Sequence, residues 1–134
     1  MLCVIRGAGD IATGIALRLW RAGLRVVCCD LPVPTSIRRT VCLSEAIRVG
    51  QARVEDARGV RAETTAEALS VVAGGDIAVM ADPEAACVAE LAPDVVVDAI
   101  LAKRNLGTTR DMAPVVVGVG PGFTAQVDCD ACVE

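Results

Sequence analysis

The first thirty residues carry the feature that most constrains the fold, because four segments follow one another in a fixed order. Residues 2–6 predict a strand, residues 7–12 a glycine turn, residues 13–22 an amphipathic helix, and a second apolar strand ends at residues 29–30. Strand, glycine turn, helix and strand in this order are typical of a βαβ opening that binds nucleotides. The sequence therefore predicts a parallel sheet with a phosphate-friendly turn at one of its edges.

The residues of the turn suit the close approach of an anion. Gly7, Ala8 and Gly9 allow a tight bend and let the backbone come near a phosphate, and Ala12 keeps the helix near the strand. The start of the helix also offers free N–H groups and a partial positive charge. Asp30 follows Gly9 by twenty-one residues, where a carboxylate would accept hydrogen bonds from a ribose 2′-OH.

Asp10 favours a different interpretation of the same turn. Its carboxylate would lie in the first helical turn, where it can satisfy the amides that a phosphate would otherwise use. The segment would then be a Rossmann-like turn that is closed by its own acidic cap and holds no dinucleotide. Rossmann-like folds host many functions, so both interpretations stay open on the sequence.

Composition excludes several classes of protein. A chain of 134 residues has room for one domain, and no apolar run approaches the roughly 18–20 residues of a membrane span. The N-terminus has no basic region ahead of an apolar core, so we expect no signal peptide, no membrane partner and a cytoplasmic location. A net charge of −4 and an aromatic content of 1% argue against a nucleic-acid partner.

The residue types that are missing narrow the chemistry. The chain has no His and no Tyr, which excludes Ser-His-Asp and Cys-His catalysis, His-containing metal sites and a Tyr/Lys dehydrogenase pair. Acid–base work would fall to Asp, Glu, Cys or the one Lys, and we assign no catalytic residue. Whether the protein is an enzyme therefore stays open.

The seven cysteines predict buried thiols rather than a disulfide framework. Five of them lie among Val, Ile, Leu and Ala, and the odd number in an α/β chain argues against paired bridges. Cys129 and Cys132 form a Cys-x-x-Cys pair, for which we favour packing over a redox pair or half of a metal site. No metal site is predicted.

The remaining segments alternate between helix and strand. The expected elements are a loop over 31–35, a helix over 44–49 capped by Ser44, a hairpin of strands 52–55 and 60–63, a helix over 64–73 with a capping box, a strand over 76–81, a helix from 82–84 to 92–94, and buried strands over 95–100 and 114–119. This alternation predicts one α/β domain over residues 1–134. Its sheet is expected to be doubly wound, mostly parallel and Rossmann-like, with the hairpin as an insertion.

Two loops after predicted strands are candidates for ligand contact. Ligands bind outside the carboxyl ends of strands in such sheets, where Asp98 ends one strand. The loop after it carries Lys103, which is the only Lys, together with Arg104 and Asn105; a solvated loop cation is the alternative. The turn after residue 119 holds Gly120, Gly122 and Phe123 and could form an anion-binding nest, or let the chain leave the sheet while Phe123 covers the core.

Four motifs in this order resemble those of a known family. Residues 6–14 (RGAGDIATG), 34–40 (PTSIRRT), 97–107 (VDAILAKRNLG) and 120–125 (GPGFTA) are similar to the selenium-dependent molybdenum hydroxylase system proteins of the YqeB type. That family is related to the accessory factors of xanthine dehydrogenase, and the resemblance runs almost end to end. It also implies that the family architecture continues beyond the position of Glu134, with residues 1–134 as its N-terminal part.

The resemblance implies an accessory role rather than the hydroxylase activity itself. A Rossmann-type accessory protein of this kind would help mature or insert the molybdopterin cofactor of a molybdenum hydroxylase, and a hydroxylase subunit would be a partner. By motif, the ligand-binding residues would come from four segments: Gly7, Gly9, Asp10 and Thr13 at the first loop, Arg38 and Arg39 as a cationic wall, Lys103, Arg104 and Asn105 at the opposing loop, and Gly120, Gly122 and Phe123 at the floor.

The function expected from the sequence is the binding of a small phosphorylated ligand, either a nucleotide or a molybdopterin dinucleotide. Backbone amides of the two glycine turns would bind the phosphates, and Lys103, Arg104 and Arg38 would neutralise them. One alternative is an NAD(P)-dependent oxidoreductase or a nucleotidyl transfer step, with Asp98 or Lys103 in proton transfer. A second is a protein that docks a hydroxylase without a small ligand. A homodimer is compatible with each of them.

Overall fold

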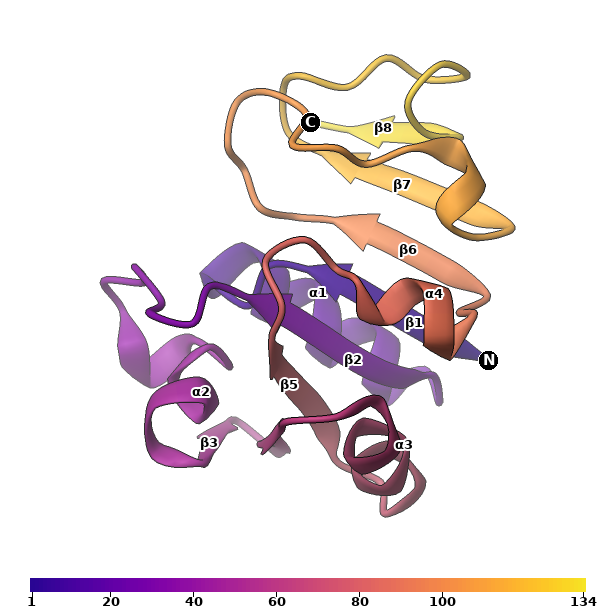
Figure 1. The fold of residues 1–134 in the computed structure, drawn as a ribbon. Helices are drawn as coiled ribbons and strands as arrows, with labels where there is room; N and C mark the ends of the chain where they lie inside the picture. The colour runs from indigo at the N-terminus through magenta and orange to yellow at the C-terminus, as the bar shows by residue number, and fades with distance from the viewer.

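The computed structural model describes residues 1–134 and contains one eight-stranded sheet with helices on both faces (Figure 1). The strands lie in the order β3-β4-β5-β2-β1-β6-β7-β8. Their bounds are β1 (Leu2–Arg6), β2 (Arg25–Asp30), β3 (Gln51–Val54), β4 (Ala57–Ala62), β5 (Ile77–Ala81), β6 (Val95–Asp98), β7 (Val115–Val119) and β8 (Ala131–Val133). Only the pair of β3 and β4 is antiparallel, so the predicted mostly parallel α/β sheet is confirmed.

The connectivity is that of a Rossmann-like sheet. Without the β3–β4 hairpin, the six remaining strands follow the spatial order third, second, first, fourth, fifth and sixth. This is the order of dinucleotide-binding domains built from two βαβαβ halves. The direction of winding reverses between β1 and β6, and the loops that leave these two strands diverge there.

The predicted hairpin is present as an insertion between β2 and β5. β3 pairs with β4 through Gln51↔Val60 and Val54↔Ala57. β4 also pairs with β5 in parallel, so the insertion widens the main sheet instead of standing apart from it. Buried and exposed residues alternate from Ala57 to Val60 only, and the buried Ala57 and Ala62 belong to cores on opposite faces, so the prediction of one face in water is wrong for the end of β4.

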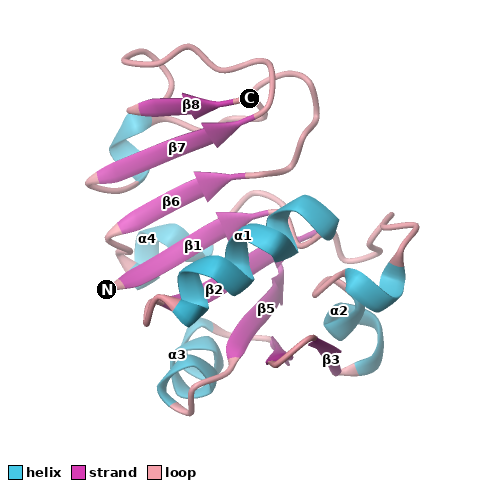
Figure 2. Ribbon diagram, turned by 180° about the vertical axis from the view of Figure 1, so that it is seen from behind, coloured by secondary structure: helices cyan, strands magenta, loops and turns pink.

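The helices divide between the two faces of the sheet (Figure 2). One face carries α1 (Asp10–Arg21) and α2 (Glu45–Val49), and the other carries α3 (Thr65–Ala73) and α4 (Cys87–Leu91). Two short 3₁₀ helices, η1 (Arg39–Val41) and η2 (Arg110–Met112), complete the set. None of these helices has both the length and the apolar character needed to cross a membrane.

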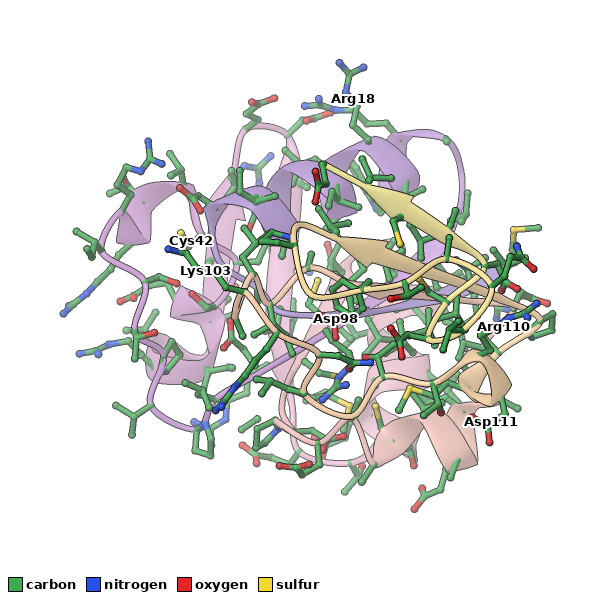
Figure 3. The ribbon with its side chains drawn as sticks, turned by 90° about the horizontal axis from the view of Figure 1, so that it is seen from above. Arg18, Cys42, Asp98, Lys103, Arg110 and Asp111 are labelled. Carbon is green, nitrogen blue, oxygen red and sulfur yellow. The ribbon has the colours of Figure 1, made fainter.

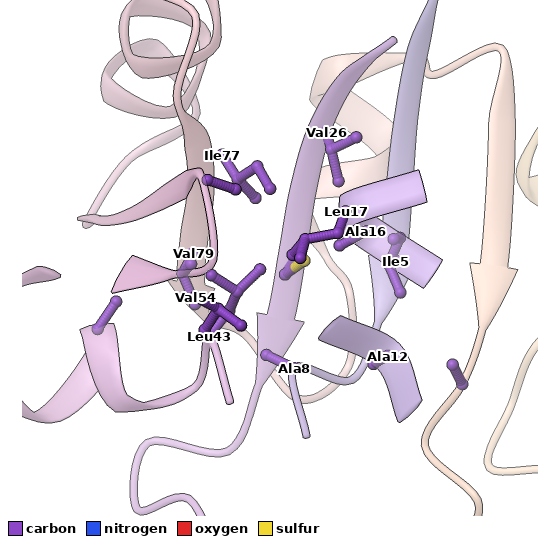
Figure 4. Close-up of a cluster of buried hydrophobic side chains, with 14 of the residues drawn as sticks. Ile5, Ala8, Ala12, Ala16, Leu17, Val26, Leu43, Val54, Ile77 and Val79 are labelled. Atoms are coloured by element: carbon purple, nitrogen blue, oxygen red, sulfur yellow. The ribbon is translucent and has the colours of Figure 1, made fainter. Parts of the chain in front are cut away.

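Each face has its own hydrophobic core. On the α1 face, Ala16 and Leu17 of the helix pack against Ile5 and Val26 of the central strands (Figure 4). On the α3 face, Val72 and the first residues of α4 cover alternate residues of the same strands. β1, β2 and β5 are thus buried on both sides, which is why they read as continuous apolar runs in the sequence.

α1 begins at Asp10, three residues before the predicted start; of the three later helix starts, one is confirmed and two differ from the prediction. Thr64 caps α3 by accepting a hydrogen bond from the Glu67 N–H at 3.2 Å. Ser44 precedes α2 but makes no side-chain cap, because its hydroxyl lies 2.9 Å from that of Ser36. The helix expected at residues 82–84 begins only at Cys87, because the chain first bends at Ala85, whose φ is +53°.

Asp82 explains where α4 begins. Its two carboxylate oxygens accept hydrogen bonds from the N–H groups of Ala86 and Cys87, at 3.0 and 2.8 Å. The capping role predicted for Asp82 is therefore correct, but its carboxylate caps the amides four and five residues after it instead of those two and three residues after it. Pro83 belongs to the intervening turn and not to the first helical turn.

Gly118 of β7 has no side chain because an aromatic ring occupies the space beside it. A Cβ atom built on Gly118 would overlap the ring of Phe123, which packs against the core of the α3 face. Gly14, on the exposed side of α1, has no atom within 4 Å of the same hypothetical position. The same substitution by Ala can therefore be compared at a crowded position, Gly118, and at an open one, Gly14.

We expect Gly118→Ala to destabilise the protein by about 1–3 kcal/mol, because the added methyl must displace the Phe123 ring. Gly14→Ala should instead stabilise it by up to about 1 kcal/mol, since Ala has the higher helix propensity and meets no neighbour. Urea denaturation of both variants measures the two free energies of unfolding. Equal effects of the two substitutions would contradict the packing described for Phe123.

Candidate functional site

A cleft of about 680 Å³ lies at the carboxyl ends of β1, β2 and β6. It occupies the place where the winding of the sheet reverses, which is where open α/β sheets bind their ligands. Its volume is in the range of small-molecule sites, about 300–1,000 Å³. Its walls come from the 7–12 turn, the start of the 31–36 loop, the 83–84 turn and the loop that follows β6.

The glycine turn supplies unpaired backbone donors to this cleft. Gly9 is the N-cap of α1, and the N–H groups of Gly9, Asp10 and Ala12 have no acceptor within the chain. All three residues line the cleft. Free N–H groups at a helix N-terminus are the donors that anions accept in proteins.

Gly7 lets two strands approach each other at the base of the cleft. Its φ is +109°, and a Cβ atom there would lie 2.8 Å from the carbonyl oxygen of Ala99. The Ala99 N–H in turn donates to the carbonyl of Arg6 at 2.8 Å. The exit of β6 is therefore held directly against the turn after β1.

Asp30 lies at the end of β2 beside the glycine turn, as expected, and lines the cleft. Its carboxylate accepts hydrogen bonds from the N–H groups of Ala8 at 2.8 Å and Leu31 at 2.7 Å. The side chain therefore fixes the shape of the turn within the chain. Each carboxylate oxygen can accept a second hydrogen bond, so a sugar hydroxyl could still be accepted.

Asp10 combines the two interpretations that the sequence left open. One carboxylate oxygen accepts the Ile11 N–H at 2.9 Å, and the other forms an exposed ion pair with Arg38. Asp10 thus satisfies one helix amide and leaves its neighbours unpaired. The ion pair ties the glycine turn to the 35–38 loop, and both partners line a smaller groove that adjoins the cleft.

A buried polar network underlies the cleft. The Arg6 guanidinium donates to the Thr108 hydroxyl at 2.6 Å, and that hydroxyl donates to the carboxylate of Asp98 at 2.6 Å. Arg6 and Asp98 are each 2% exposed, and their charged atoms lie 3.6 Å apart. Arg6 also donates to the carbonyls of Leu106 at 3.1 Å and Pro83 at 3.3 Å. One side chain therefore connects β1, β6 and two of the loops that form the cleft.

Arg6 is the functional candidate that sequence reasoning missed. It lines the cleft, and its Nε is a buried donor with no partner in the chain. A charged side chain at the end of a five-residue apolar strand was the available signal. The sequence motifs place the cationic contacts on Arg38, Arg39, Lys103 and Arg104 instead.

The predicted opposing loop lies beside the cleft, but its two cations do not line it. Asn105 lines the cleft and holds the loop in shape by exchanging two hydrogen bonds with the backbone of Thr108. Lys103 and Arg104 are exposed and have no ion-pair partner. Figure 3 shows Lys103 on the carboxyl side of the sheet, far from Arg110 and Asp111. The two cations therefore belong to the rim.

The second glycine turn packs on that loop rather than facing the cleft. Cβ atoms on Gly120 and Gly122 would contact the Leu101 side chain and the Arg104 backbone. The Gly120 N–H donates to the carbonyl of Val133 at 2.7 Å. Phe123 covers the core, which is the alternative that the sequence allowed. None of the three lines the cleft, so this turn supports the rim from outside.

The remaining residues predicted to bind a ligand, Thr13, Ala8 and Arg39, do not line the cleft. Thr13 is buried; its hydroxyl donates to the carbonyl of Ala8 and accepts the Leu43 N–H. Ala8 is buried beneath the turn, and Arg39 is exposed in η1 without lining either hollow. Of the fifteen residues predicted to bind a ligand, those that line the cleft are Gly7, Gly9, Asp10, Asp30 and Asn105.

The thiols of the chain form two close pairs. Cys29 Sγ, at the wall of the cleft, lies 3.4 Å from Cys87 Sγ, and Cys129 Sγ lies 3.5 Å from Cys132 Sγ. The contact with Cys87 and burial raise the pKa of the Cys29 thiol well above its usual value. Cys129 is buried, in keeping with the packing role favoured for this pair, whereas Cys132 is exposed.

Comparison with known proteins finds a homologue. The chain is 51% identical over 133 residues to an Escherichia coli (strain K12) protein named "Uncharacterized protein YqeB". The match covers 99% of this chain and 25% of that protein, so the chain spans about a quarter of its relative. No family model and no solved structure matches the chain.

We expect Thr108→Val to destabilise the protein by about 2–3 kcal/mol, because it leaves two buried charged groups without the hydroxyl that joins them. The matched control is Thr109→Val, since Thr109 is exposed and its hydroxyl reaches only Asp111. That control should stay within about 0.5 kcal/mol of the unmodified protein. Urea midpoints at unchanged m-value measure both, and a mild Thr108→Val phenotype would argue against a supporting role of the network.

Proposed function

We propose that this domain binds a nucleotide-bearing, phosphorylated small molecule in the cleft at the carboxyl ends of β1, β2 and β6. The observation that carries the proposal is the set of three unpaired amides at the start of α1, which lie in one cleft with a buried arginine. Amides and the guanidinium are donors that a phosphate accepts. Asp30 stands across the turn from them, as a ribose-binding carboxylate does in a dinucleotide-binding βαβ unit.

The electrostatics of the cleft limit how much charge the ligand can bring. Asp10, Asp30 and Glu84 line it, and Arg6 is the one cation among the lining residues. A ligand with a compact diphosphate and hydroxyl-rich or amine-bearing ends suits this balance better than a highly charged one. The amides would bind the phosphates, while the carboxylates would accept hydrogen bonds from ribose or from a heterocycle.

The finer proposal is a molybdopterin dinucleotide, handled during the maturation of a molybdenum hydroxylase. It rests on the motif resemblance, and the homologue at 51% identity supports the YqeB part of that resemblance alone. A molybdopterin dinucleotide joins a diphosphate to a nucleoside, which is the chemistry that the cleft offers. NAD(P) is the second candidate, because the strand order and the position of Asp30 are those of dinucleotide-binding domains.

A thermal-shift series with NAD, NADP, CTP, CDP and molybdopterin tests the proposal. A ligand at a hundred times its dissociation constant should stabilise the protein by about 2.7 kcal/mol. Gly9→Val should remove that shift, because its side chain projects from the residue whose amide faces the cleft. Gly14→Val, on the exposed side of α1, is the matched control. A shift unaffected by Gly9→Val would place the ligand elsewhere, and no shift with any of the five would favour the docking protein.

We expect Lys103→Ala to weaken binding of the responding nucleotide by up to about fivefold, as loss of an exposed charge near a phosphate costs about 1 kcal/mol or less. The melting temperature of the free protein should not change, because Lys103 has no partner in the chain. Arg18→Ala is the matched control, since this exposed cation projects from α1 away from Lys103 (Figure 3). Isothermal titration measures both, and equal affinities would remove Lys103 from the site.

A further inference from the structure

We propose that Cys29, Asp82 and Cys87 form a zinc site in the wall of the cleft. The three side chains come from the end of β2, the turn after β5 and the first residue of α4. One ligand atom from each lies within 4.8 Å of the other two. The proposal is independent of the nucleotide, because none of these residues belongs to the glycine turn.

The distances suit a tetrahedral ion. Two thiolates bound to one Zn²⁺ at about 2.3 Å lie about 3.8 Å apart. The sulfur atoms of Cys29 and Cys87 are 3.4 Å apart, so a small rotation of either side chain brings them to this spacing. Two sulfur donors with one carboxylate oxygen favour zinc over Mg²⁺ or Ca²⁺, which select oxygen ligands.

The carboxylate of Asp82 is already oriented for this role. Its oxygens accept the N–H groups of Ala86 and Cys87, which fixes the side chain relative to the Cys87 thiol. Such outer hydrogen bonds hold metal ligands in place, and each oxygen keeps a lone pair for an ion. The same turn therefore aligns two of the three donors.

Access to the site is from the cleft. Cys29 and Cys87 are 3% and 4% exposed, and Cys29 lines the cleft together with Pro83 and Glu84. Three protein donors leave a fourth position for water or for a donor atom of a bound molecule, as in zinc sites that act on substrates. Two thiolates, a carboxylate and Zn²⁺ sum to −1, and the Arg6 guanidinium bonded to the Pro83 carbonyl supplies a nearby positive charge.

The chain contains its own control for thiol pairs. Cys129 and Cys132 have sulfur atoms 3.5 Å apart, but no third His, Cys, Asp or Glu donor joins them in a cluster. The two thiol pairs have similar sulfur–sulfur distances, and only the Cys29–Cys87 pair has a carboxylate, that of Asp82, beside it. Cys132→Ser should leave the zinc site unchanged.

Zinc uptake by the reduced, metal-free protein tests the proposal. After incubation with Zn²⁺ in a phosphine reductant and gel filtration, elemental analysis should find one equivalent in the unmodified protein and in Cys132→Ser. Cys87→Ser should weaken zinc binding more than about 100-fold, since loss of an outer partner alone costs about 10- to 100-fold. Co²⁺ in place of Zn²⁺ should give the thiolate-to-metal absorption band.

Asp82→Asn keeps the test decisive if Cys87→Ser does not fold. It should weaken zinc binding at least about tenfold and retain the thiolate band with Co²⁺, while circular dichroism confirms the fold. Absence of zinc from the unmodified protein, a cobalt complex without that band, or equal losses in Cys87→Ser and Cys132→Ser would overturn the proposal.

Discussion

The bridge from Arg6 through the Thr108 hydroxyl to Asp98 is the interaction on which the candidate site depends. It crosses from the end of β1 to the end of β6, at the point where the sheet reverses its winding. Removing one partner of a buried ion pair costs about 3–5 kcal/mol, because the other charge is left uncompensated. The same guanidinium binds carbonyls of two loops, so the positions of these loops follow from one buried side chain.

This arrangement separates what supports the cleft from what a ligand would contact. Thr13, Asp98 and Thr108 are buried and bonded to the chain itself. Unpaired donors remain at the start of α1 and on the Nε of Arg6. A buried donor without a partner carries a free-energy cost, which an accepting ligand would remove. Thr13, Asp98 and Thr108 are therefore hydrogen-bonded within the chain, whereas the amides of Gly9, Asp10 and Ala12 at the cleft are not.

Most of the fold could be predicted from the sequence, because parallel strands buried on both faces read as apolar runs and helix starts have local signals. Thr64 with Glu67 was such a signal and proved correct. The capping role of Asp82 was predicted correctly, but the start of α4 was not. The carboxylate caps amides beyond a bend at Ala85, whose positive φ has no sequence signature. The capping residue could be identified, whereas the path between cap and helix could not.

The candidate site was predictable where it follows from topology and less so where it depends on the path of loops. The glycine turn and Asp30 lie where the βαβ pattern put them. Lys103 follows β6 and Gly120 follows the neighbouring strand β7. The turn at Gly120 packs on the loop that carries Lys103, and both residues stay outside the cleft. Arg6 escaped notice because its importance comes from Thr108, a hundred residues away in sequence.

The contact between Gly7 and the Ala99 carbonyl has a consequence for how such a domain can change over time. Main-chain atoms, not side chains, set the separation of the two strands at the base of the cleft. Substitutions along the walls can then alter which guest is accepted without altering how wide the opening is. Ligand specificity could then change through wall residues while the backbone stays fixed, and position 7 is where a methyl group would push the two strands apart.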